Sequence, residues 1–222
     1  ARELDTLENT YKSEIYGLII EGIRKFCNDL SICVSLTGRL HPEFEKRSEV
    51  LSLFPDMASL TMSSLNFPKG ASVNEPDMIL KLIESMDKYG VIPEIECFDS
   101  GMLNYTNYLI NKNILKGPHY INVIFGNMYN AQSDVSTISS IMNNKPKDSI
   151  MCFGGIGKDQ LYSNVLGLIY ADGIRIGLED NLYYFGKEKT TNLSLLKRTH
   201  RLLKEFNLNF MTPTEFKNMG YT

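Results

Sequence analysis

Short β-like runs alternate with amphipathic stretches along this chain of 222 residues. Each run is followed by a loop that contains Gly, Asn, Ser or Asp, and then by a pattern with apolar residues at helical spacing. This alternation is typical of a parallel sheet with crossover helices. The predicted strands cover residues 31–37, 57–62, 92–99, 120–126, 149–154 and 173–180.

Helical patterns lie between these runs and after the last of them. The predicted helices cover residues 14–26, 77–88, 105–113, 134–143, 159–170 and 192–206. Asp77, Asp134 and Asp159 are expected to cap three of them, because a short polar side chain can accept from the free N–H groups of the first turn. Thr212 followed by Pro213 predicts a further short helix near the end of the chain.

The number of units suggests part of a barrel. Eight βα units form a TIM barrel of about 250 residues, whereas six units that begin with a helix do not close well. We therefore expect an α/β protein with a single TIM (β/α)8 barrel domain over residues 1–222, which covers about six of the eight units and lacks the first two strands. A six-stranded doubly wound sheet is the alternative.

Polar side chains gather on one face of several predicted strands. Because alternate residues of a barrel strand point inward, these side chains are expected to meet in the middle, while the apolar faces pack on helices. Together they predict a small polar ligand, although Ser and Thr also serve to satisfy neighbouring backbone groups. The inward set comprises Cys33, Ser35, Thr37, Ser59, Thr61, Ser63, Glu94, Glu96 and Asn122.

The first two strands carry the groups that suit a carboxylate. Hydroxyls and backbone amides around Thr37, Gly38 and Thr61 are candidate donors, and Arg39 is a candidate counter-charge. For each hydroxyl, a bond to nearby backbone is the alternative interpretation.

The last predicted strand ends in charged residues. Arg175 and Glu179 would share its inner face, and buried charges are unfavourable unless they pair with each other, a metal or a ligand. Glu179 and Asp180 lie at the carboxyl end, where parallel barrels keep their chemistry. Glu94 and Glu96 could bind a substrate ammonium, pair with Arg175, or form a structural ion-pair network.

A glycine-rich loop, Gly154–Gly157, lies between a predicted strand and a predicted helix. Glycine lets backbone amides approach a phosphate at such a position. Gly155 and Gly157 are therefore candidate contacts for a phosphate-bearing cofactor such as CoA, with a plain tight turn as the alternative.

Composition limits the partners and the cellular compartment that we expect for this chain. A formal charge of -3 and a pI near 5.7 argue against a general affinity for nucleic acid or anionic membranes. No apolar stretch approaches the roughly 18 to 20 residues of a membrane span. Four widely spaced cysteines in apolar surroundings predict buried thiols of a reduced, cytoplasmic protein. They are Cys27, Cys33, Cys97 and Cys152.

The segment Gly173-Ile-Arg-Ile-Gly-Leu-Glu-Asp-Asn-Leu-Tyr183 resembles the charged hallmark of the β-keto acid cleavage enzyme family. Further matching segments follow in the same order as in that family and extend over almost the whole chain. They are residues 55–61 with 66–67, 93–99, 154–157, 191–192 and 212–213.

The resemblance implies a zinc-dependent TIM barrel that acts on a β-keto acid and acetyl-CoA and yields acetoacetate and a new CoA thioester. It implies that Glu179 is a zinc ligand and that Asp180 and Arg175 form the catalytic pair. It also implies a homo-oligomer, a dimer or a tetramer. The family's contacts to the substrate carboxylate match Ser35, Thr37 and Thr61.

One departure from the family concerns the metal. The family's other zinc ligands are an HxH pair on the second strand, whereas His41, His119 and His200 are isolated. The resemblance therefore implies that about fifty residues precede Ala1, consistent with the usual barrel length. Without them, we expect weak zinc binding and no activity. The alternatives are another metal-dependent lyase or aldolase on this scaffold, and a metal-free, non-catalytic homologue.

Overall fold

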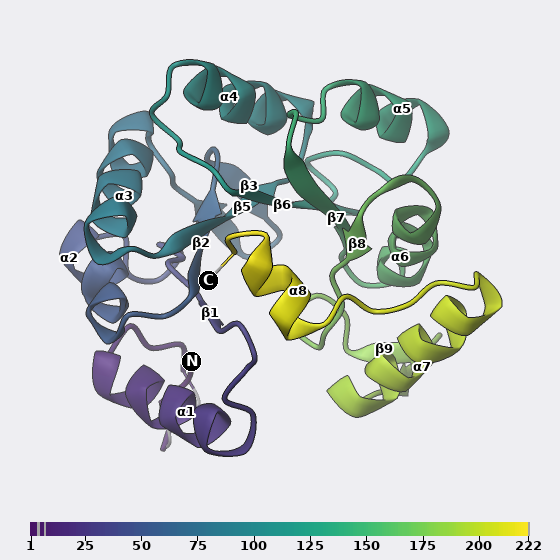
Figure 1. Ribbon diagram of the computed structural model, residues 1–222, viewed down its shortest axis with the longest axis horizontal. Coiled ribbons are helices and arrows are strands. Elements are labelled where there is room, and N and C mark those ends of the chain that lie inside the picture. The colour runs from purple at the N-terminus through teal and green to yellow at the C-terminus, as the bar shows by residue number, and fades with distance from the viewer. Residues whose placement is uncertain (4, 7, 222) are drawn as a thin grey trace.

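Six parallel strands form one sheet whose order follows the chain without reversal (Figure 1). The computed structural model describes residues 1–3, 5–6 and 8–221. The strands of the sheet are β1 (Cys33–Val34), β2 (Met57–Thr61), β5 (Ile92–Cys97), β6 (His119–Phe125), β7 (Ser149–Gly155) and β8 (Gly173–Ile174). Each lies where the sequence predicts a strand.

Helices surround this sheet, and the last of them lies across one end of it (Figure 1). They are α1 (Ser13–Phe26), α2 (Phe44–Ser48), the 3-10 helix η1 (Glu49–Leu53), α3 (Pro76–Tyr89), α4 (Ser100–Asn111), α5 (Val135–Asn143), α6 (Asp159–Tyr170), α7 (Asn192–Glu205) and α8 (Pro213–Asn218). Two small hairpins complete the fold, β3 (Leu65–Phe67) with β4 (Gly70–Ser72) and β9 (Tyr183–Phe185) with β10 (Glu188–Lys189). Within the described ranges, no helix has the length and apolar character needed to cross a membrane.

The strand order decides between the two predicted architectures. A doubly wound sheet reverses its strand order at a switch point. Here β1, β2, β5, β6, β7 and β8 are neighbours in sequence order, and the connecting helices cover one side. The fold is therefore an α/β parallel half-barrel, as the prediction of a barrel requires, and the doubly wound alternative is wrong.

Helix caps agree with the sequence only in part. The side chain of Asp134 accepts from Thr137 N, and Thr212 forms a capping box at the start of α8, so both caps are confirmed. The predictions for Asp77 and Asp159 are wrong. These two residues lie inside the first turns of α3 and α6, one or two positions beyond the N-cap.

The last strand is shorter than predicted. β8 pairs with β7 only at Gly173 and Ile174, and the chain then turns instead of continuing to residue 180. The carbonyl of Gly177 accepts from the N–H groups of Asp180 and Asn181, with Gly177 itself at φ 148°. Arg175 and Glu179 therefore do not share a strand face, because Glu179 and Asp180 lie in this turn.

Register places the polar faces of adjacent strands side by side. Ser59 pairs with Glu94, and Thr61 with Glu96, between β2 and β5. At the amino ends of the strands, α8 lies across the base of the sheet, where Phe216 packs on Tyr120. The carboxyl ends of the strands are thus left to form a site.

Burial of the cysteines differs from the prediction. All four are free thiols. Cys97 and Cys152 are buried as expected, but Cys27 and Cys33 are exposed. Cys27 follows the end of α1 at the surface, and Cys33 belongs to the polar face of β1, so neither lies against the apolar core.

Candidate active site

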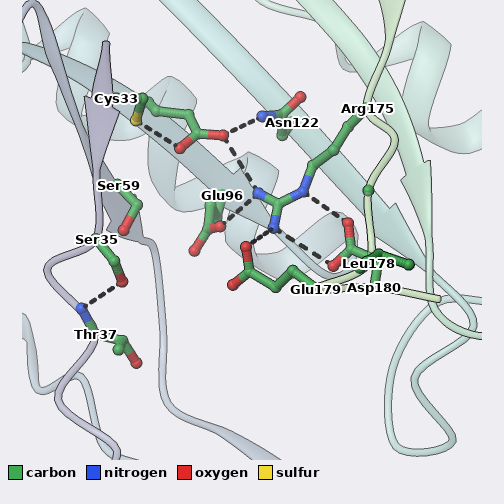
Figure 2. Close-up of polar contacts among 12 residues, drawn as sticks. Cys33, Ser35, Thr37, Ser59, Glu96, Asn122, Arg175, Leu178, Glu179 and Asp180 are labelled. Atoms are coloured by element: carbon green, nitrogen blue, oxygen red, sulfur yellow. Dashed lines mark hydrogen bonds and ion pairs between the residues drawn. The ribbon is translucent and has the colours of Figure 1, made fainter. Parts of the chain in front are cut away.

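A cavity of about 710 Å³ opens among the carboxyl ends of the strands. Side chains of β1, β2, β5 and β6 line it together with the turn that follows β8 (Figure 2). Most of the residues that the sequence nominates for a site meet here. Those that line the cavity are Ser35, Thr37, Thr61, Glu94, Glu96, Arg175, Glu179 and Asp180.

The guanidinium of Arg175 lies at the centre of four carboxylates (Figure 2). Its Nε donates to Asp180 Oδ2 at 2.9 Å, and its Nη1 donates to Glu96 Oε1 at 2.8 Å and to Glu94 Oε1 at 3.3 Å. Glu179 Oε2 is 3.5 Å from Nη2, but the Glu179 side chain is 83% exposed, whereas the other three carboxylates are largely buried. One cation therefore faces four potential anions.

This arrangement shifts the pKa values of Glu96 and Arg175. Burial raises the pKa of Glu96 to about 7, because the favourable charge of Arg175 only partly offsets the desolvation and the repulsion from Glu94. Burial alone would lower the pKa of Arg175, but Glu96, Asp180 and Glu94 outweigh it and raise that pKa. Arg175 therefore remains protonated, while Glu96 can gain or lose a proton near neutral pH.

Glu94 is held from three sides. Besides Arg175, the amide of Asn122 donates to Glu94 Oε1, and the thiol of Cys33 donates to Glu94 Oε2 at 3.0 Å. Although Cys33 is exposed to the cavity, surrounding protein atoms and then Glu94 raise the pKa of its thiol well above the usual value. Cys33 is thus a hydrogen-bond donor in the site and a weak nucleophile.

Three hydroxyl groups of the predicted inward set have local partners. Thr61 Oγ1 donates to Glu96 Oε2 at 2.9 Å. Ser59 Oγ accepts from a backbone N–H of the loop after β1 at 3.2 Å, and Ser35 Oγ accepts from Thr37 N at 3.3 Å. Ser35 and Ser59 thus accept from backbone N–H groups, as the alternative interpretation expects, and their role toward a ligand stays a prediction, while Thr61 bonds to the carboxylate cluster.

Two buried amides on α6 hold the turn that carries Arg175 and Asp180. Asn164 Nδ2 donates to the carbonyl of Arg175 at 2.8 Å, and Gln160 Nε2 donates to the carbonyl of Gly177 at 3.0 Å. Both side chains are almost completely buried. Because β8 ends at Ile174, these amides satisfy carbonyls that have left the sheet. Polar residues on the sheet-facing side of the predicted helix were a signal for this role that the sequence interpretation missed.

The glycine loop is packed against α6. A Cβ on Gly155 would lie 2.6 Å from the carbonyl oxygen of Asp159, so only glycine fits at that position. Gly157 has φ 59° and open space around it, and its N–H donates to the carbonyl of Asp180 at 2.7 Å. Neither glycine lines the cavity described above. Their predicted contact with a CoA phosphate stays a prediction.

The residues present do not by themselves fit a metal ion. Within the described ranges there is no group of three His, Cys, Asp or Glu side chains arranged to hold one. Glu94, Glu96 and Asp180 are turned toward Arg175, which leaves the exposed carboxylate of Glu179 as the oxygen ligand this cluster could offer. A zinc site as the sequence resemblance implies it requires ligands besides these.

Fold and site together define a class of protein: a parallel α/β half-barrel with an ion cluster at the carboxyl ends of its strands. The family model of the beta-keto acid cleavage enzymes matches residues 1–220. The chain therefore belongs to the beta-keto acid cleavage enzyme family, which confirms the resemblance noted in the sequence.

Individual relatives support this assignment. The chain is 28% identical to a 3-keto-5-aminohexanoate cleavage enzyme of Acetoanaerobium sticklandii, over 95% of this chain and 78% of the relative. It is 32% identical to a 3-oxoadipate:acetyl-CoA acetyltransferase of Cupriavidus necator, over 75% and 60% of the two chains. A solved ternary complex of ObcA with a C4-CoA adduct and oxalate shares the fold, with a TM-score of 0.82 at 16% identity, over 96% of this chain and 57% of that one.

Proposed function

We propose that this chain forms the catalytic core of an acetyl-CoA-dependent β-keto acid cleavage enzyme, a carbon–carbon bond cleaving acyltransferase. The Arg175 cluster carries the proposal, because it joins one permanent cation to several carboxyl groups, one of them with a pKa of about 7, inside a ligand-sized cavity. The names of the two relatives, one a keto acid cleavage enzyme and one an acetyl-CoA acetyltransferase, support the same reaction.

The proposed reaction exchanges one acyl group for another. The carbon between the two carbonyl groups of the β-keto acid loses a proton and attacks the thioester carbonyl of acetyl-CoA, which releases the CoA thiolate. The thiolate then attacks the original keto carbonyl and cleaves its bond to that carbon. Reprotonation of the carbon yields acetoacetate, and the other product is a new acyl-CoA, so all atoms are accounted for.

In this proposal, Asp180 and Arg175 form the catalytic pair. Asp180 takes the proton, and Arg175 holds that carboxylate in place through Nε at 2.9 Å while its charge stabilises the developing enolate. Glu96, whose pKa lies near the operating pH, provides a second place for a proton beside the same guanidinium.

The substrate is proposed to lie between the hydroxyl groups and the carboxylates. Ser35, Thr37 and Thr61, which line the cavity, would receive its carboxylate together with the neighbouring Gly38, which is not among the lining residues, and Glu94 and Glu96 would face its other end. Because four carboxyl groups surround one guanidinium, a positively charged substituent is favoured there over a negative one. The amino group in the name of the Acetoanaerobium sticklandii relative's substrate agrees with this charge. Gly155 and Gly157 are proposed for the phosphates of acetyl-CoA.

Zinc is part of the proposal, with Glu179 as the ligand that this chain contributes. When bound, a zinc ion would polarise the keto carbonyl of the substrate. Because the described residues do not complete a metal site, the steps above depend on no metal.

We further propose that this chain forms a single domain and that the active barrel has eight strands, of which the six-stranded sheet described above is a part. The half-barrel leaves β1 and β8 as free edges, and the pocket lies between them. We also propose that the protein is a cytoplasmic homo-oligomer, either a dimer or a tetramer. The molar mass of the purified protein, measured by light scattering, tests the oligomeric state.

The function is tested on the purified protein. Incubation of a panel of β-keto acids with acetyl-CoA should yield acetoacetate and the matching acyl-CoA, detected by mass spectrometry, at a rate that depends on acetyl-CoA. Cleavage that proceeds without acetyl-CoA would favour a lyase and overturn the proposal.

Metal analysis provides a second, independent test. We expect about one zinc per chain, as a catalytic site requires, and loss of metal or activity in Glu179→Gln. Full activity of Glu179→Gln would contradict the proposed ligand, and an inactive protein that carries no zinc would favour a non-catalytic homologue.

A further inference from the structure

Arg47, in the short helix α2, is a buried cation that the ion cluster does not use. This residue is only 4% exposed, yet it lines the cavity, near the loop that follows β1. Burial lowers the pKa of Arg47 to about 10, with no nearby carboxylate to offset the desolvation. A buried charge without a counter-charge is unfavourable, so its presence calls for an explanation.

The hydrogen bonds of Arg47 all go to uncharged oxygens. Nε donates to the carbonyl of Leu36 at 2.8 Å, and Nη2 donates to Asn74 Oδ1 at 2.8 Å. Nη1 has one long contact, 3.5 Å, to the carbonyl of Val73. Among the described residues, no carboxylate lies within ion-pair distance of this guanidinium. Its positive charge is thus held in place by neutral groups and remains available to an anion.

The position of Arg47 relative to Gly38 shows where that charge acts. A Cβ on Gly38 would lie 2.8 Å from Arg47 Nη1 and 3.1 Å from Cζ, so the guanidinium lies directly against this residue. Arg47 also donates to the carbonyl of Leu36, which lies in the same loop. The loop that carries Ser35, Thr37 and Gly38 is therefore both positioned by Arg47 and placed in its positive field.

Other cations that line the cavity are already engaged. Arg175 is surrounded by carboxylates, and Lys46 pairs with Glu43 at 2.9 Å. Arg39, the counter-charge predicted from the sequence, is exposed and lies 4.0 Å over the ring of Phe67. Arg47 is better preorganised than Arg39 to act on an anion, because its guanidinium is buried and fixed by three acceptors.

We propose that Arg47 is the positioning residue of an anion subsite at the Ser35–Gly38 loop, and that this subsite takes the carboxylate of the β-keto acid. The inference rests on the proposed function for the identity of the ligand. Its geometry also explains the polarity of the cavity, with the negative end of the substrate at Arg47 and the other end at Glu94 and Glu96.

The test compares a charged ligand with a neutral analogue and needs no turnover. Binding of acetoacetate and of its methyl ester to the purified protein is measured by calorimetry without acetyl-CoA. We expect the wild type to prefer the acid. Arg47→Met should weaken acetoacetate binding by about tenfold or more and leave ester binding within about twofold. Arg47→Lys should retain part of the preference, because it keeps the charge.

Two further variants separate the charge from the packing. Arg39→Met should still bind acetoacetate more tightly than the methyl ester. Loss of this preference in Arg39→Met would assign the subsite to Arg39 instead. Gly38→Ala should reduce the preference, because its Cβ displaces the guanidinium, and it tests the proposal even where Arg47→Met fails to fold. An unchanged preference in folded Arg47→Met or in Gly38→Ala would overturn the subsite.

Failure of the subsite and failure of the enzyme reaction give different results. Charge-dependent binding of acetoacetate without any acetyl-CoA-dependent cleavage would refute the proposed function and retain the subsite. Cleavage with an unchanged KM for the keto acid in Arg47→Met would refute the subsite and retain the function.

Discussion

Arg175 Nη1 and Glu96 Oε1 lie 2.8 Å apart, although 79 residues separate them in the chain. The pair joins the turn after β8 to the face of β5 across the half-barrel. Because Glu96 has a pKa of about 7 in this setting, the contact joins a permanent cation to a carboxyl group that changes its charge near neutral pH.

Glu96 should make the stability of the protein depend on pH. Its pKa rises from 4.5 to about 7 on folding, so the folded state binds more protons than the unfolded state between these values. The contribution of Glu96 to the free energy of unfolding is therefore fully present below about pH 4.5 and is lost as pH rises through 7. Urea unfolding at intervals from pH 5 to 8 measures this slope.

Glu96→Gln should flatten that slope, whereas Glu188→Gln, on the exposed β10, should not. Equal slopes in Glu96→Gln and the wild type would show that another group titrates.

Asp180→Asn should lower kcat/KM by about 100-fold or more, because it removes the proposed base and the closest ionic partner of Arg175 Nε. Steady-state kinetics of the keto acid with acetyl-CoA measure the loss. Asp87→Asn breaks an exposed pair with Lys116 and is the matched control, for which we expect wild-type rates. Wild-type turnover in Asp180→Asn would remove this residue from the catalytic pair.

Asn164→Ala should impair the site as well as the fold. It leaves the carbonyl of Arg175 without its side-chain donor, while the carbonyl of Phe153 keeps the backbone N–H of Arg175, and we expect about 1–3 kcal/mol of lost stability. Because the turn that carries Asp180 loses its anchor, kcat should fall more than KM changes. Denaturant unfolding and kinetics of the same preparation test both effects.

Asn107→Ala is the control for this prediction. Asn107 also donates to two backbone carbonyls, those of Leu103 and Asn144, but it lies on α4 and does not line the cavity. Comparable losses of kcat in the two variants would mean that Asn164 acts only through global stability.

Gly155→Ala should destabilise the protein by about 1–3 kcal/mol, because the new Cβ would meet the α6 backbone at 2.6 Å. Gly22→Ala, within α1 and with open space around it, should have no such effect. Thermal unfolding compares the two. If Gly155 also binds the phosphates of acetyl-CoA, the KM for acetyl-CoA should rise in folded Gly155→Ala. An unchanged KM would limit the role of Gly155 to packing.

The parallel sheet could be predicted because its signal is local. Alternation of strand-like and helical runs, read through hydrophobic periodicity, located all six strands, from β1 to β8. Caps were less predictable, since Asp77 and Asp159 satisfy the sequence rule but lie one or two positions beyond the N-cap of their helices. The length of β8 also escaped prediction, because Ile174, Ile176 and Leu178 continue a strand pattern through a turn.

The sequence by itself determined the order of the elements, the polar inner faces and the family, because these depend on spacing and residue type along the chain. Only the tertiary structure decided which charged groups are buried and which of them pair with one another. Burial around Glu96, the amides of α6 beneath Arg175 and the unpaired guanidinium of Arg47 arise from contacts between distant segments. Desolvation and Coulomb energy depend on distances in space, which residue spacing along a chain does not contain.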